Sequence, residues 1–569
     1  MTKKDVVALF QSARIDATLA HRVYREHGAA TFSNLTRDPY TTLFGLNGFT
    51  VNHADKISKH LNKPLEAIVV GHIMWIVLKQ PSPFSTVKMR VQTSLDVDAL
   101  TMAGMMKTLT ENQQVVLMDK YLLHPQDHQL LCDVASEIRD RCDSMNNEHY
   151  TMKWAFEEVE CGEEQKNAML MVATNRLSVI TGGPGCGKSW VVRQMLEKFP
   201  NARVTAPTGR AARNADGKTV HYFKTIQDSQ KGKLGDVDLI IVDEASMLSA
   251  YLMKAVFKMA RNDAHIVLVG DSNQLPPIQT GHVLRDILAS GKVPVARLTN
   301  NVRSVVPLHA FCDDLLKGRV TILEYHNDTR TPISFIECNS TDDMLNALPR
   351  TFPHIVLTPH NATRVKMNKV LQLFARGMQA TNFSLDVRCV SPFGCLTLHQ
   401  YAIARVEPSK VIVVDEHSGA SEEMTYAEAC QCITPFGRAA ESGTVIQKMD
   451  TVIITRNTAG LCNGDITTYV GDDTVRTSDG EKCKIQSLVN TDPGFALGYC
   501  ITVHKAQGSE FDTVVIPICN VSAWTKTLLY TAVTRAKDRV IFLGSKRDLQ
   551  CILTTNSERH VPPFLRSVL

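Results

Sequence analysis

The chain has 569 residues, which suggests three or four domains at about 150 residues each. It is 44% hydrophobic and 21% charged, and this ordinary balance excludes collagen-like and intrinsically disordered chains. Because the net charge is only +4, any grip on nucleic acid is expected to come from a local channel and not from a global basic field.

No sign of secretion or membrane insertion is found in the sequence. The start, Met1-Thr-Lys-Lys-Asp5, is not followed by the apolar segment of a signal peptide. The longest apolar stretch, residues 67–78, is shorter than the roughly 20 residues that cross a bilayer, so it predicts a buried helix. The 15 cysteines are expected to be free thiols in a reducing compartment. We expect an intracellular protein, cytoplasmic or nuclear (in the host nucleus if it is viral), without a membrane partner.

The first part of the chain is helical in pattern, with turns near residues 37–40 and 45–49. From about residue 155, short β-branched runs alternate with helical segments. The strands expected from these runs are 177–180, 203–206, 238–243 and 265–270 in a first set, and 354–358, 451–455, 499–503, 513–518 and 539–544 in a second. This alternation predicts the α/β class, with parallel sheets covered by helices in two similar lobes.

Two segments depart from the alternation. Residues 376–440 contain strand-like runs and an acidic loop that fit neither lobe. Their cysteines are spaced poorly for zinc, so we expect buried thiols there and not a metal site; they are Cys389, Cys395, Cys430 and Cys432. Residues 466–492 are short, polar and strand-like, and they predict a small β insert.

Residues 182–189 read Gly-Gly-Pro-Gly-Cys-Gly-Lys-Ser and fit the phosphate-binding pattern G-x-x-x-x-G-K-S between an expected strand and helix. Glycines let backbone N–H groups cradle phosphate oxygens, and the helix presents its positive end to the same anion. Lys188 is expected to reach the β- and γ-phosphates, and Ser189 to hold Mg²⁺. The predicted nucleotide-binding residues of this loop are Gly182, Gly183, Pro184, Gly185, Cys186, Gly187, Lys188 and Ser189.

Cys186 lies inside this loop. A helix N-terminus can lower the pKa of a thiol, so oxidation of Cys186 could block nucleotide binding. The plainer interpretation is a small residue that fits the turn.

Two carboxylates, Asp243 and Glu244, follow the expected strand 238–243 directly. Carboxylates at the end of a buried strand are costly unless they are used or paired. We expect Asp243 to hold Mg²⁺ and Glu244 to polarise the attacking water. In the turn-rich loop 270–277, Gln274 is expected to sense the γ-phosphate or its water.

Arg303 and Arg535 are the candidates for neutralising charge on the transferred phosphoryl group, because a planar guanidinium suits that geometry. Arg535 lies on the second lobe, so closure of that lobe would couple hydrolysis to lobe movement. Gln165, before the phosphate loop, is a candidate for contacting the adenine edge.

Two further loops suit contacts with a nucleic-acid backbone. One follows a strand of the first lobe and contains Pro207, Thr208, Gly209 and Arg210. The other lies on the second lobe and contains Thr502, His504 and Lys505. One such loop per lobe predicts a track for a single strand across both lobes.

These motifs, in this order, resemble superfamily 1 helicases, and in particular RecD-like helicases of the stand-alone type with an N-terminal extension. The segments that carry the resemblance are 177–189, 206–212 with 219–221, 242–247, 456–457 with 463–465, 502–510, and 530–535. The N-terminal segments 38–40, 48–49 and 54–57 are similar to the helix-hairpin-helix of that group, a clamp for DNA backbone; a purely structural helical domain is the alternative.

The resemblance implies two RecA-like P-loop NTPase lobes with a helical N-terminal domain and a small β insert. It implies use of ATP with Mg²⁺, movement along single-stranded DNA in the 5′→3′ direction, and unwinding of duplex DNA in replication, recombination or repair, with other replication or repair proteins as possible partners. It adds Gly508 and Glu510 to the nucleotide site, and His221 and Thr358 to the nucleic-acid contacts.

The expected domains follow from these motifs. They are 1–62, like a helix-hairpin-helix; 63–154, a helical extension; 155–345, the first RecA-like lobe; 346–465, the first part of the second lobe with the insertion 376–440; 466–492, a small barrel-like β insert; 493–550, the rest of the second lobe; and 551–569, a C-terminal tail.

The chain departs from the family pattern in three places, one of which is the insertion 376–440. The stretch 224–235 is short where the family has a pin that splits the duplex, and Arg303 is followed by Ser304 where glutamine is usual. A motor that tracks RNA or displaces proteins without separating strands is therefore an alternative. A scaffold subunit is another, although it would have no reason to keep the catalytic set. A GTP switch would need Asn-Lys-x-Asp, and neither Asn62-Lys63 nor Asn368-Lys369 is followed by that aspartate.

Overall fold

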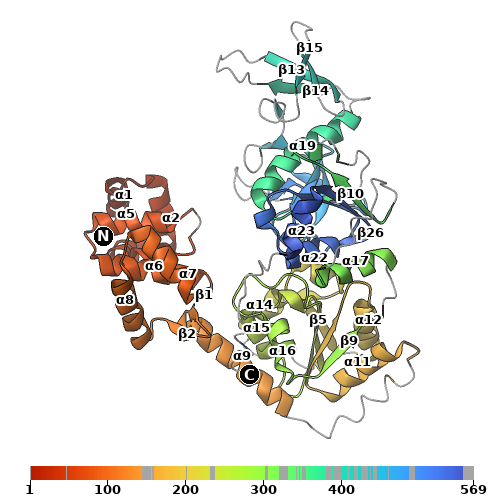
Figure 1. Ribbon diagram of the computed structural model, residues 1–569, viewed down its shortest axis with the longest axis horizontal. Helices are drawn as coiled ribbons and strands as arrows, with labels where there is room; N and C mark the ends of the chain where they lie inside the picture. Colours follow the sequence, from red (N-terminus) through yellow and green to blue (C-terminus); the bar gives the residue numbers. More distant parts are fainter. Residues whose placement is uncertain are drawn as a thin grey trace.

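The computed structural model shows a helical N-terminal unit standing beside two stacked α/β lobes (Figure 1). The residues that it describes are 2–46, 48–143, 156, 159–199, 201–230, 237–300, 306–318, 331–340, 343–344, 347–348, 354–379, 386–389, 399–406, 411–415, 421–424, 433–435, 438–439, 445–446, 448–458, 460–485, 494–554, 565 and 569. Within these residues, no helix has both the length and the apolar character that crossing a membrane requires.

The N-terminal unit packs its helices into adjoining hydrophobic clusters. Its elements are α1 (Lys3–Ser12), α2 (Ala17–His27), η1 (Gly28–Ala30), α3 (Thr31–Arg37), α4 (Pro39–Leu43), α5 (Val51–His60), α6 (Leu65–Lys79), α7 (Phe84–Leu95) and α8 (Ala99–Glu111), with a small antiparallel sheet of β1 (Ser82–Pro83), β3 (Tyr121–Leu123) and β2 (Val116–Met118). The helix predicted from the apolar run 67–78 is α6, and its apolar face is buried.

The predicted border between residues 62 and 63 is wrong, because α6 packs against α4 across it. A Cβ on Gly71 would lie 2.2 Å from the Tyr40 ring, so only glycine allows this approach. The Tyr40 hydroxyl donates to Asp55 Oδ1 (2.6 Å), and His72 Nε2 lies 2.7 Å from the same oxygen. This network ties α4, α5 and α6 together; whether the segment also clamps DNA stays a prediction.

Helix α9 (Pro125–Asp143) connects the N-terminal unit to the first lobe and belongs to the lobe by its packing (Figure 1). Its residues Leu131, Val134 and Ile138 lie in the core of that lobe. The Arg141 guanidinium donates to the carbonyl of Ala264 at 3.2 Å. The predicted helical extension 63–154 is therefore too long, because the apolar face of α9 is covered by lobe residues far away in the sequence.

The first lobe has a six-stranded, all-parallel sheet in the order β6-β5-β7-β8-β4-β9. Its strands are β4 (Leu177–Gly182), β5 (Ala202–Ala206), β6 (Lys218–Thr219), β7 (Leu239–Val242), β8 (His265–Gly270) and β9 (Val295–Leu298). Its helices are α11 (Glu163–Thr174), α12 (Lys188–Lys198), α13 (Gly209–Asn214), α14 (Val220–Gln230), η2 (Ala245–Met247), α15 (Ala250–Met259) and α16 (Val283–Ser290). In Figure 1, α11 and α12 lie on one side of the sheet and α14 to α16 on the other. The four strands predicted for this set are confirmed.

The second lobe has a five-stranded parallel sheet in the order β10-β26-β25-β11-β24. Its strands are β10 (Ile333–Glu337), β11 (Ile355–Thr358), β24 (Cys500–Thr502), β25 (Phe511–Ile518) and β26 (Ala536–Gly544). Its helices are α17 (Val306–Leu316), α19 (Asn361–Gln379), α21 (Val503–Ala506), η5 (Val521–Ala523), α22 (Lys526–Val533) and α23 (Lys546–Thr554). The predicted border at 345/346 is wrong, because β10 pairs with β26 and α17 packs on α22.

Residues 451–455 were expected in the second parallel sheet, and this prediction is wrong. Strand β19 (Thr451–Ile454) pairs antiparallel with β20 (Ile466–Gly471) and β23 (Phe495–Leu497). With β21 (Thr474–Arg476) and β22 (Lys482–Lys484) these strands form a five-stranded sheet in the order β22-β21-β20-β19-β23. The predicted insert 466–492 is therefore part of a larger sheet that includes the strands on either side of it.

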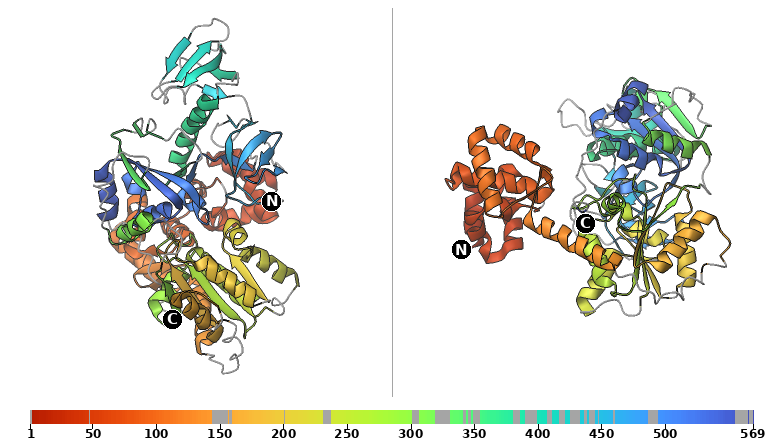
Figure 2. Two further views of the ribbon diagram at one scale, coloured as in Figure 1. Left: turned by 90° about the vertical axis from the view of Figure 1, so that its right-hand side faces the viewer. Right: turned by 60° about the horizontal axis from the view of Figure 1, so that its bottom comes forward.

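The segment that fitted neither lobe forms a separate antiparallel sheet, β15-β14-β13-β12-β16, beyond the end of α19 (Figures 1 and 2). Its strands are β12 (Asp386–Cys389), β13 (His399–Val406), β14 (Val411–Asp415), β15 (Ser421–Met424) and β16 (Ile433–Pro435), and the short strands β17 (Arg438–Ala439) and β18 (Val445–Ile446) pair nearby in sequence. Cys389 ends β12, whereas Cys395, Cys430 and Cys432 lie outside the described residues. Across the described part of the chain, no cluster of three or more histidine, cysteine or acidic side chains is placed to hold a metal ion.

The far end of the chain returns to the first lobe. Leu565 and Leu569 lie in the core of that lobe, and the Leu565 N–H donates to Asp286 Oδ2 at 3.1 Å. The Lys292 ammonium contacts the carbonyl of Leu569. Figure 1 places this end beside α9.

Candidate nucleotide cleft and nucleic-acid track

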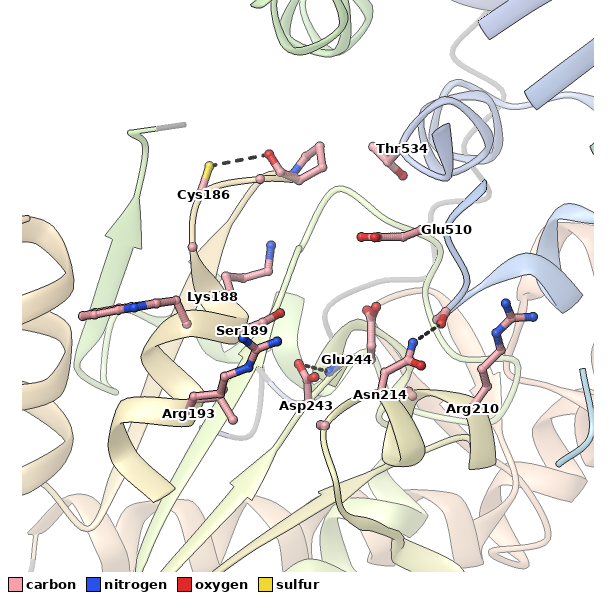
Figure 3. Close-up of a pocket in the computed structure, with 18 of the residues that line it drawn as sticks. Cys186, Lys188, Ser189, Arg193, Arg210, Asn214, Asp243, Glu244, Glu510 and Thr534 are labelled. Carbon is pink, nitrogen blue, oxygen red and sulfur yellow. Dashed lines mark hydrogen bonds between the residues drawn. The ribbon is translucent and has the colours of Figure 1, made fainter. Parts of the chain in front are cut away.

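A cleft of about 770 Å³ lies where the two lobes face each other (Figure 3). The predicted site residues that line it from the first lobe are Pro184, Gly185, Cys186, Gly187, Lys188, Ser189, Asp243, Glu244 and Gln274, and those from the second lobe are Gly508, Glu510 and Arg535. Residues that are hundreds of positions apart in the sequence are thus brought to one cleft.

The phosphate loop runs from the end of β4 to the start of α12. Gly185 (φ +77°) and Gly187 (φ +82°) have left-handed backbone conformations that favour glycine. A Cβ on Gly182 would lie 2.5 Å from the carbonyl of Leu298, so this position also requires glycine. The Lys188 ammonium donates to the carbonyls of Gly182 and Gly183, each at 2.7 Å. The loop, the N-terminus of α12 and this ammonium make an anion-binding site.

Asp243 and Glu244 stand at the end of β7, and the Glu244 N–H donates to Asp243 Oδ1 at 2.9 Å. Burial, and then the neighbouring Glu244 carboxylate, raise the pKa of Asp243. Glu244 has a φ of +51°, a left-handed conformation that costs a non-glycine residue about 1 kcal/mol or more. A bound cation would stabilise the negative charge of a carboxylate in such surroundings. The Ser189 hydroxyl and the Asp243 carboxylate supply hard oxygen ligands of the kind that Mg²⁺ prefers.

The loop that contains Gln274 is bonded to the second lobe. Gln274 Nε2 lies 3.5 Å from Asp271 Oδ2, and the Tyr530 hydroxyl donates to the same oxygen at 2.8 Å. The next residue of α22 also bonds this loop, because the Thr531 hydroxyl accepts from the Leu275 N–H at 3.0 Å. The roles of Asp271, Tyr530 and Thr531 were not predicted, although each lies within or next to a recognised motif segment.

Arg535 is 4% exposed and lines the cleft from the second lobe. Its guanidinium donates to the carbonyls of Thr531 and Ser509 and to the Thr534 hydroxyl, each at 3.3 Å. These oxygens are uncharged, so they fix the guanidinium without cancelling its charge. Arg303, the other predicted charge neutraliser, lies outside the described residues.

Two predictions for the nucleotide site differ from the structure. Gln165 is not among the cleft residues, because its side-chain oxygen accepts from the Gly162 N–H at 3.3 Å and so caps the start of α11. The pKa of Cys186 is raised by burial and not lowered, since its side chain is 3% exposed and burial outweighs the Lys188 charge. Burial thus favours the plainer interpretation, that Cys186 is a small residue that fits the turn.

Helix α13 bridges the two lobes. Arg210 donates to the carbonyl of Gly464 (2.9 Å), Arg213 pairs with Asp465 (2.7 Å), and Asn214 donates to the carbonyl of Gly508 (2.7 Å). Arg210, predicted to contact nucleic acid, lines the nucleotide cleft instead, because α13 turns it toward the second lobe.

Further polar residues that line the cleft were missed: Arg193, Asn214, Asp216, Thr534 and Lys537. Arg193 lies four residues after Ser189 on α12 and hence on the same helical face, which is a signal that could have found it. Figure 3 shows Glu510 and Thr534 across the cleft from Lys188.

The two loops predicted to hold nucleic acid occupy equivalent places in the two lobes. The Thr208 hydroxyl accepts from the Ala211 N–H at the start of α13, and the Thr502 hydroxyl accepts from the Lys505 N–H at the start of α21. Thr208 lies two residues after the end of β5, and Thr502 is the last residue of β24, so each lies at the carboxyl end of a parallel strand. The other predicted contacts nearby are Pro207 and Gly209 beside Thr208, the exposed His504 in α21, and the exposed His221 in α14.

Gly209 packs against the second lobe, where a Cβ on it would lie 3.2 Å from Cys462 Sγ. The side chain of Thr358, another predicted contact, is fully buried, and its hydroxyl lies 3.7 Å from Cys500 Sγ; a contact with nucleic acid at this position stays a prediction.

The described part of the stretch 224–235, residues 224–230, is the continuation of α14 and not a hairpin pin. Residues 231–236 lie outside the description.

Two parallel α/β lobes that share one cleft, with a phosphate loop on one and a buried arginine on the other, define a two-lobed P-loop NTPase. A family model described as an AAA domain matches residues 160–330, and one described as the UvrD-like helicase C-terminal domain matches residues 497–543. The chain is similar to RecD-like superfamily 1 helicases, so the resemblance predicted from the motor motifs is confirmed, whereas the N-terminal helix-hairpin-helix stays a prediction.

The ATP-dependent RecD2 DNA helicase of Deinococcus radiodurans is 27% identical over 404 residues, which are 67% of this chain and 49% of that protein. The chain thus spans about half the length of this relative. The RecBCD enzyme subunit RecD of Mycobacterium tuberculosis is 25% identical over 445 residues, 70% of this chain and 72% of that protein. A solved structure of Pif1 helicase from Bacteroides in complex with ADP-AlF3 and ssDNA is 18% identical, with a TM-score of 0.41, over 68% of this chain and 92% of that one.

Proposed function

We propose that this chain is an ATP-dependent motor that moves along single-stranded DNA in the 5′→3′ direction and separates duplex strands. The observation that carries the proposal is the shared cleft, in which Lys188 and Glu244 of the first lobe face Arg535 of the second. Because the site is formed by both lobes, nucleotide cleavage depends on the position of one lobe relative to the other. The names of the relatives, which are DNA helicases, support DNA as the substrate.

Each residue of the cleft has a distinct role in this proposal. The phosphate loop and Lys188 bind the phosphates of ATP, and Ser189 and Asp243 would hold Mg²⁺, which supplies positive charge to the phosphate oxygens. Glu244 orients the attacking water. Arg535 stabilises the charge that develops on the γ-phosphate, an effect of about 10³–10⁵ in rate for such arginines.

Movement follows from the contacts that cross between the lobes. Asn214 of the first lobe donates to the Gly508 carbonyl, and Gly508 and Asn214 both line the cleft. A change in the nucleotide therefore acts directly on an interlobe contact. The loops that begin at Thr208 and Thr502 lie one on each lobe, so a change in lobe spacing changes the length of strand between them.

A strand-displacement assay tests this function. Duplexes carry a single-stranded DNA tail on the 5′ side, the 3′ side or neither, and a matched duplex carries an RNA tail. We expect ATP-dependent displacement only with the 5′ DNA tail. Displacement from the 3′ tail alone would overturn the polarity, and preference for the RNA tail would overturn the substrate.

A motor that moves on DNA without separating strands is the second candidate. It is favoured by one observation, that residues 224–230 are helical in the short stretch where the family pattern has a pin. Release of streptavidin from a biotinylated oligonucleotide, without displacement of any duplex, would support this candidate.

A further inference from the structure

Two exposed tyrosines stand together with lysines on the first lobe. The side chains of Tyr222 on α14 and Tyr251 on α15 are 48% and 42% exposed. Lys218 Nζ lies 5.6 Å from the centre of the Tyr222 ring, and Lys224 Nζ lies 5.0 Å from the centre of the Tyr251 ring. Lys224 also donates to the Tyr251 hydroxyl at 2.6 Å, which joins the two helices at this surface.

These rings are not needed for the core. On α14, Val220 is fully buried and Phe223 packs against the core of the lobe, whereas Tyr222 points away from it and touches Phe223 only edge-on. Lys218 makes no ion pair with any of the residues that the structure describes, so its charge faces solvent beside the Tyr222 ring. The four side chains Lys218, Tyr222, Lys224 and Tyr251 are called the tyrosine–lysine surface below.

The position of this surface continues the proposed nucleic-acid track. Strands β6, β5 and β7 are neighbours in the sheet and run parallel, so their carboxyl ends share one edge. Tyr222 is in the first turn of α14 after β6, Thr208 caps α13 after β5, and Tyr251 is in the first turn of α15, the helix that follows β7. The tyrosines therefore lie at the same edge of the sheet as Thr208.

We propose that the tyrosine–lysine surface is a base-stacking site for single-stranded DNA, which extends the track beyond Thr208 on the first lobe. Aromatic faces stack on any base, and adjacent ammonium groups attract the phosphates between the bases, so such a site binds without sequence preference. The inference rests on the proposed function, since it extends the path of the same strand. It gives the first lobe a contact with unpaired bases on α14 and α15, next to the stretch where the family pattern has a pin.

The test compares paired substitutions of the two rings. Tyr222→Ala with Tyr251→Ala removes both stacking faces, and Tyr222→Phe with Tyr251→Phe keeps them. Binding of a fluorescent 20-mer of thymidine to the full chain is measured by anisotropy at fixed salt. We expect the Kd of the alanine pair to rise about 10- to 100-fold and that of the phenylalanine pair to stay within about threefold, given stacking energies of this kind. Thermal unfolding of both variants reports whether either fold is damaged.

A second measurement does not depend on substitution. An oligonucleotide with 5-iododeoxyuridine is photocrosslinked to the unsubstituted chain, and the modified peptides are identified by mass spectrometry. We expect a crosslink at Tyr222 or Tyr251. Unchanged affinity of the alanine pair, or crosslinks confined to other segments, would overturn the inference.

The contribution of the two lysines can be tested through the salt dependence of the Kd. Lys218→Gln with Lys224→Gln should lower the dependence of log Kd on log salt by about 0.7 per lysine that meets a phosphate. An unchanged salt slope would count against the two lysines. The proposed function can fail while this inference holds: the chain would then bind the 20-mer through this surface but show no DNA-dependent turnover of ATP.

Discussion

Tyr530 of the second lobe donates a hydrogen bond of 2.8 Å to the Asp271 carboxylate of the first lobe, and each side chain is only 1% exposed. Burial, and then the Asp271 charge, raise the pKa of Tyr530, so the hydroxyl keeps its proton and remains a donor. Asp271 starts the loop that carries Gln274 into the cleft, and Tyr530 lies on the helix whose end holds Arg535. The bond therefore joins two parts of the catalytic set across the lobes.

Replacing Tyr530 by phenylalanine should uncouple the lobes. The ring packing stays, but the buried Asp271 carboxylate loses the donor that reaches it from the second lobe, which we expect to cost about 1–3 kcal/mol of stability. ATP turnover in the presence of DNA should fall more than nucleotide binding does. Tyr499→Phe is the matched control, because it removes a buried tyrosine–aspartate bond, to Asp450, that stays within the second lobe. Equal effects of the two variants on DNA-dependent turnover would contradict the coupling.

Arg535→Ala should leave nucleotide affinity nearly unchanged and lower turnover by about 10³-fold or more, because the arginine acts on charge that develops in the transition state. Affinity is measured with a fluorescent ATP analogue, and turnover by phosphate release. Arg547→Ala, an exposed arginine on α23, serves as the control. Normal turnover in the Arg535 variant would show that this residue of the second lobe does not contribute to catalysis.

Lys188→Ala should reduce turnover by about 100-fold or more with little loss of fold. Its ammonium donates to the carbonyls of Gly182 and Gly183 in its own loop, so few contacts of the fold depend on it. Lys198→Ala, at the exposed end of the same helix, is the control. Strong residual turnover in the Lys188 variant, with normal turnover in the control, would mean that nucleotide is cleaved elsewhere.

Asp286 makes stability depend on pH. Burial raises the pKa of Asp286 from 3.8 to about 7, against a smaller opposing effect of the Leu565 N–H and Arg285. Between these two values the folded state keeps a proton that the unfolded state has lost, so this group makes the fold less stable as the pH rises through that window. Asp286→Asn should remove the trend and raise stability at pH 8 by about 1–3 kcal/mol, while changing little at pH 4.

Urea unfolding at the two pH values measures the effect of Asp286→Asn. Asp263→Asn is a control of opposite sign, because the bond with Arg261 lowers the pKa of Asp263 from 3.8 to about 2, so this group stabilises the fold above pH 3.8 and loses that effect as the pH falls toward 2. An asparagine at 286 that destabilised the chain equally at both pH values would contradict the account.

Much of the nucleotide cleft could be predicted because its chemistry is local. The phosphate loop needs glycines and a lysine within eight consecutive positions, and Asp243 and Glu244 follow an apolar strand directly. These patterns can be recognised in the sequence without knowledge of how the chain packs. The strands of the first lobe were predictable for the same reason, since β7 and β8 are continuous apolar runs buried on both faces.

Features set by distant packing could not be predicted in this way. The apolar face of α9 looks like that of any amphipathic helix, and only the core of the first lobe decides where it packs. Strand β19 has the same β-branched character as the parallel strands, but its partners β20 and β23 run antiparallel to it. The direction of a side chain could not be predicted either: Thr358 and Arg210 were both expected to contact nucleic acid, whereas the Thr358 side chain is buried and Arg210 lines the nucleotide cleft.

The most direct test of the central claim is phosphate release from ATP by the purified chain, with and without a single-stranded DNA oligonucleotide. The claim is that ATP is hydrolysed in one cleft formed by both lobes, and that hydrolysis depends on a DNA strand bound across both lobes. DNA should then stimulate phosphate release at least about tenfold, and Arg535→Ala should abolish the stimulation. Release at the same rate with and without DNA, in a chain shown to bind the oligonucleotide, would contradict the claim.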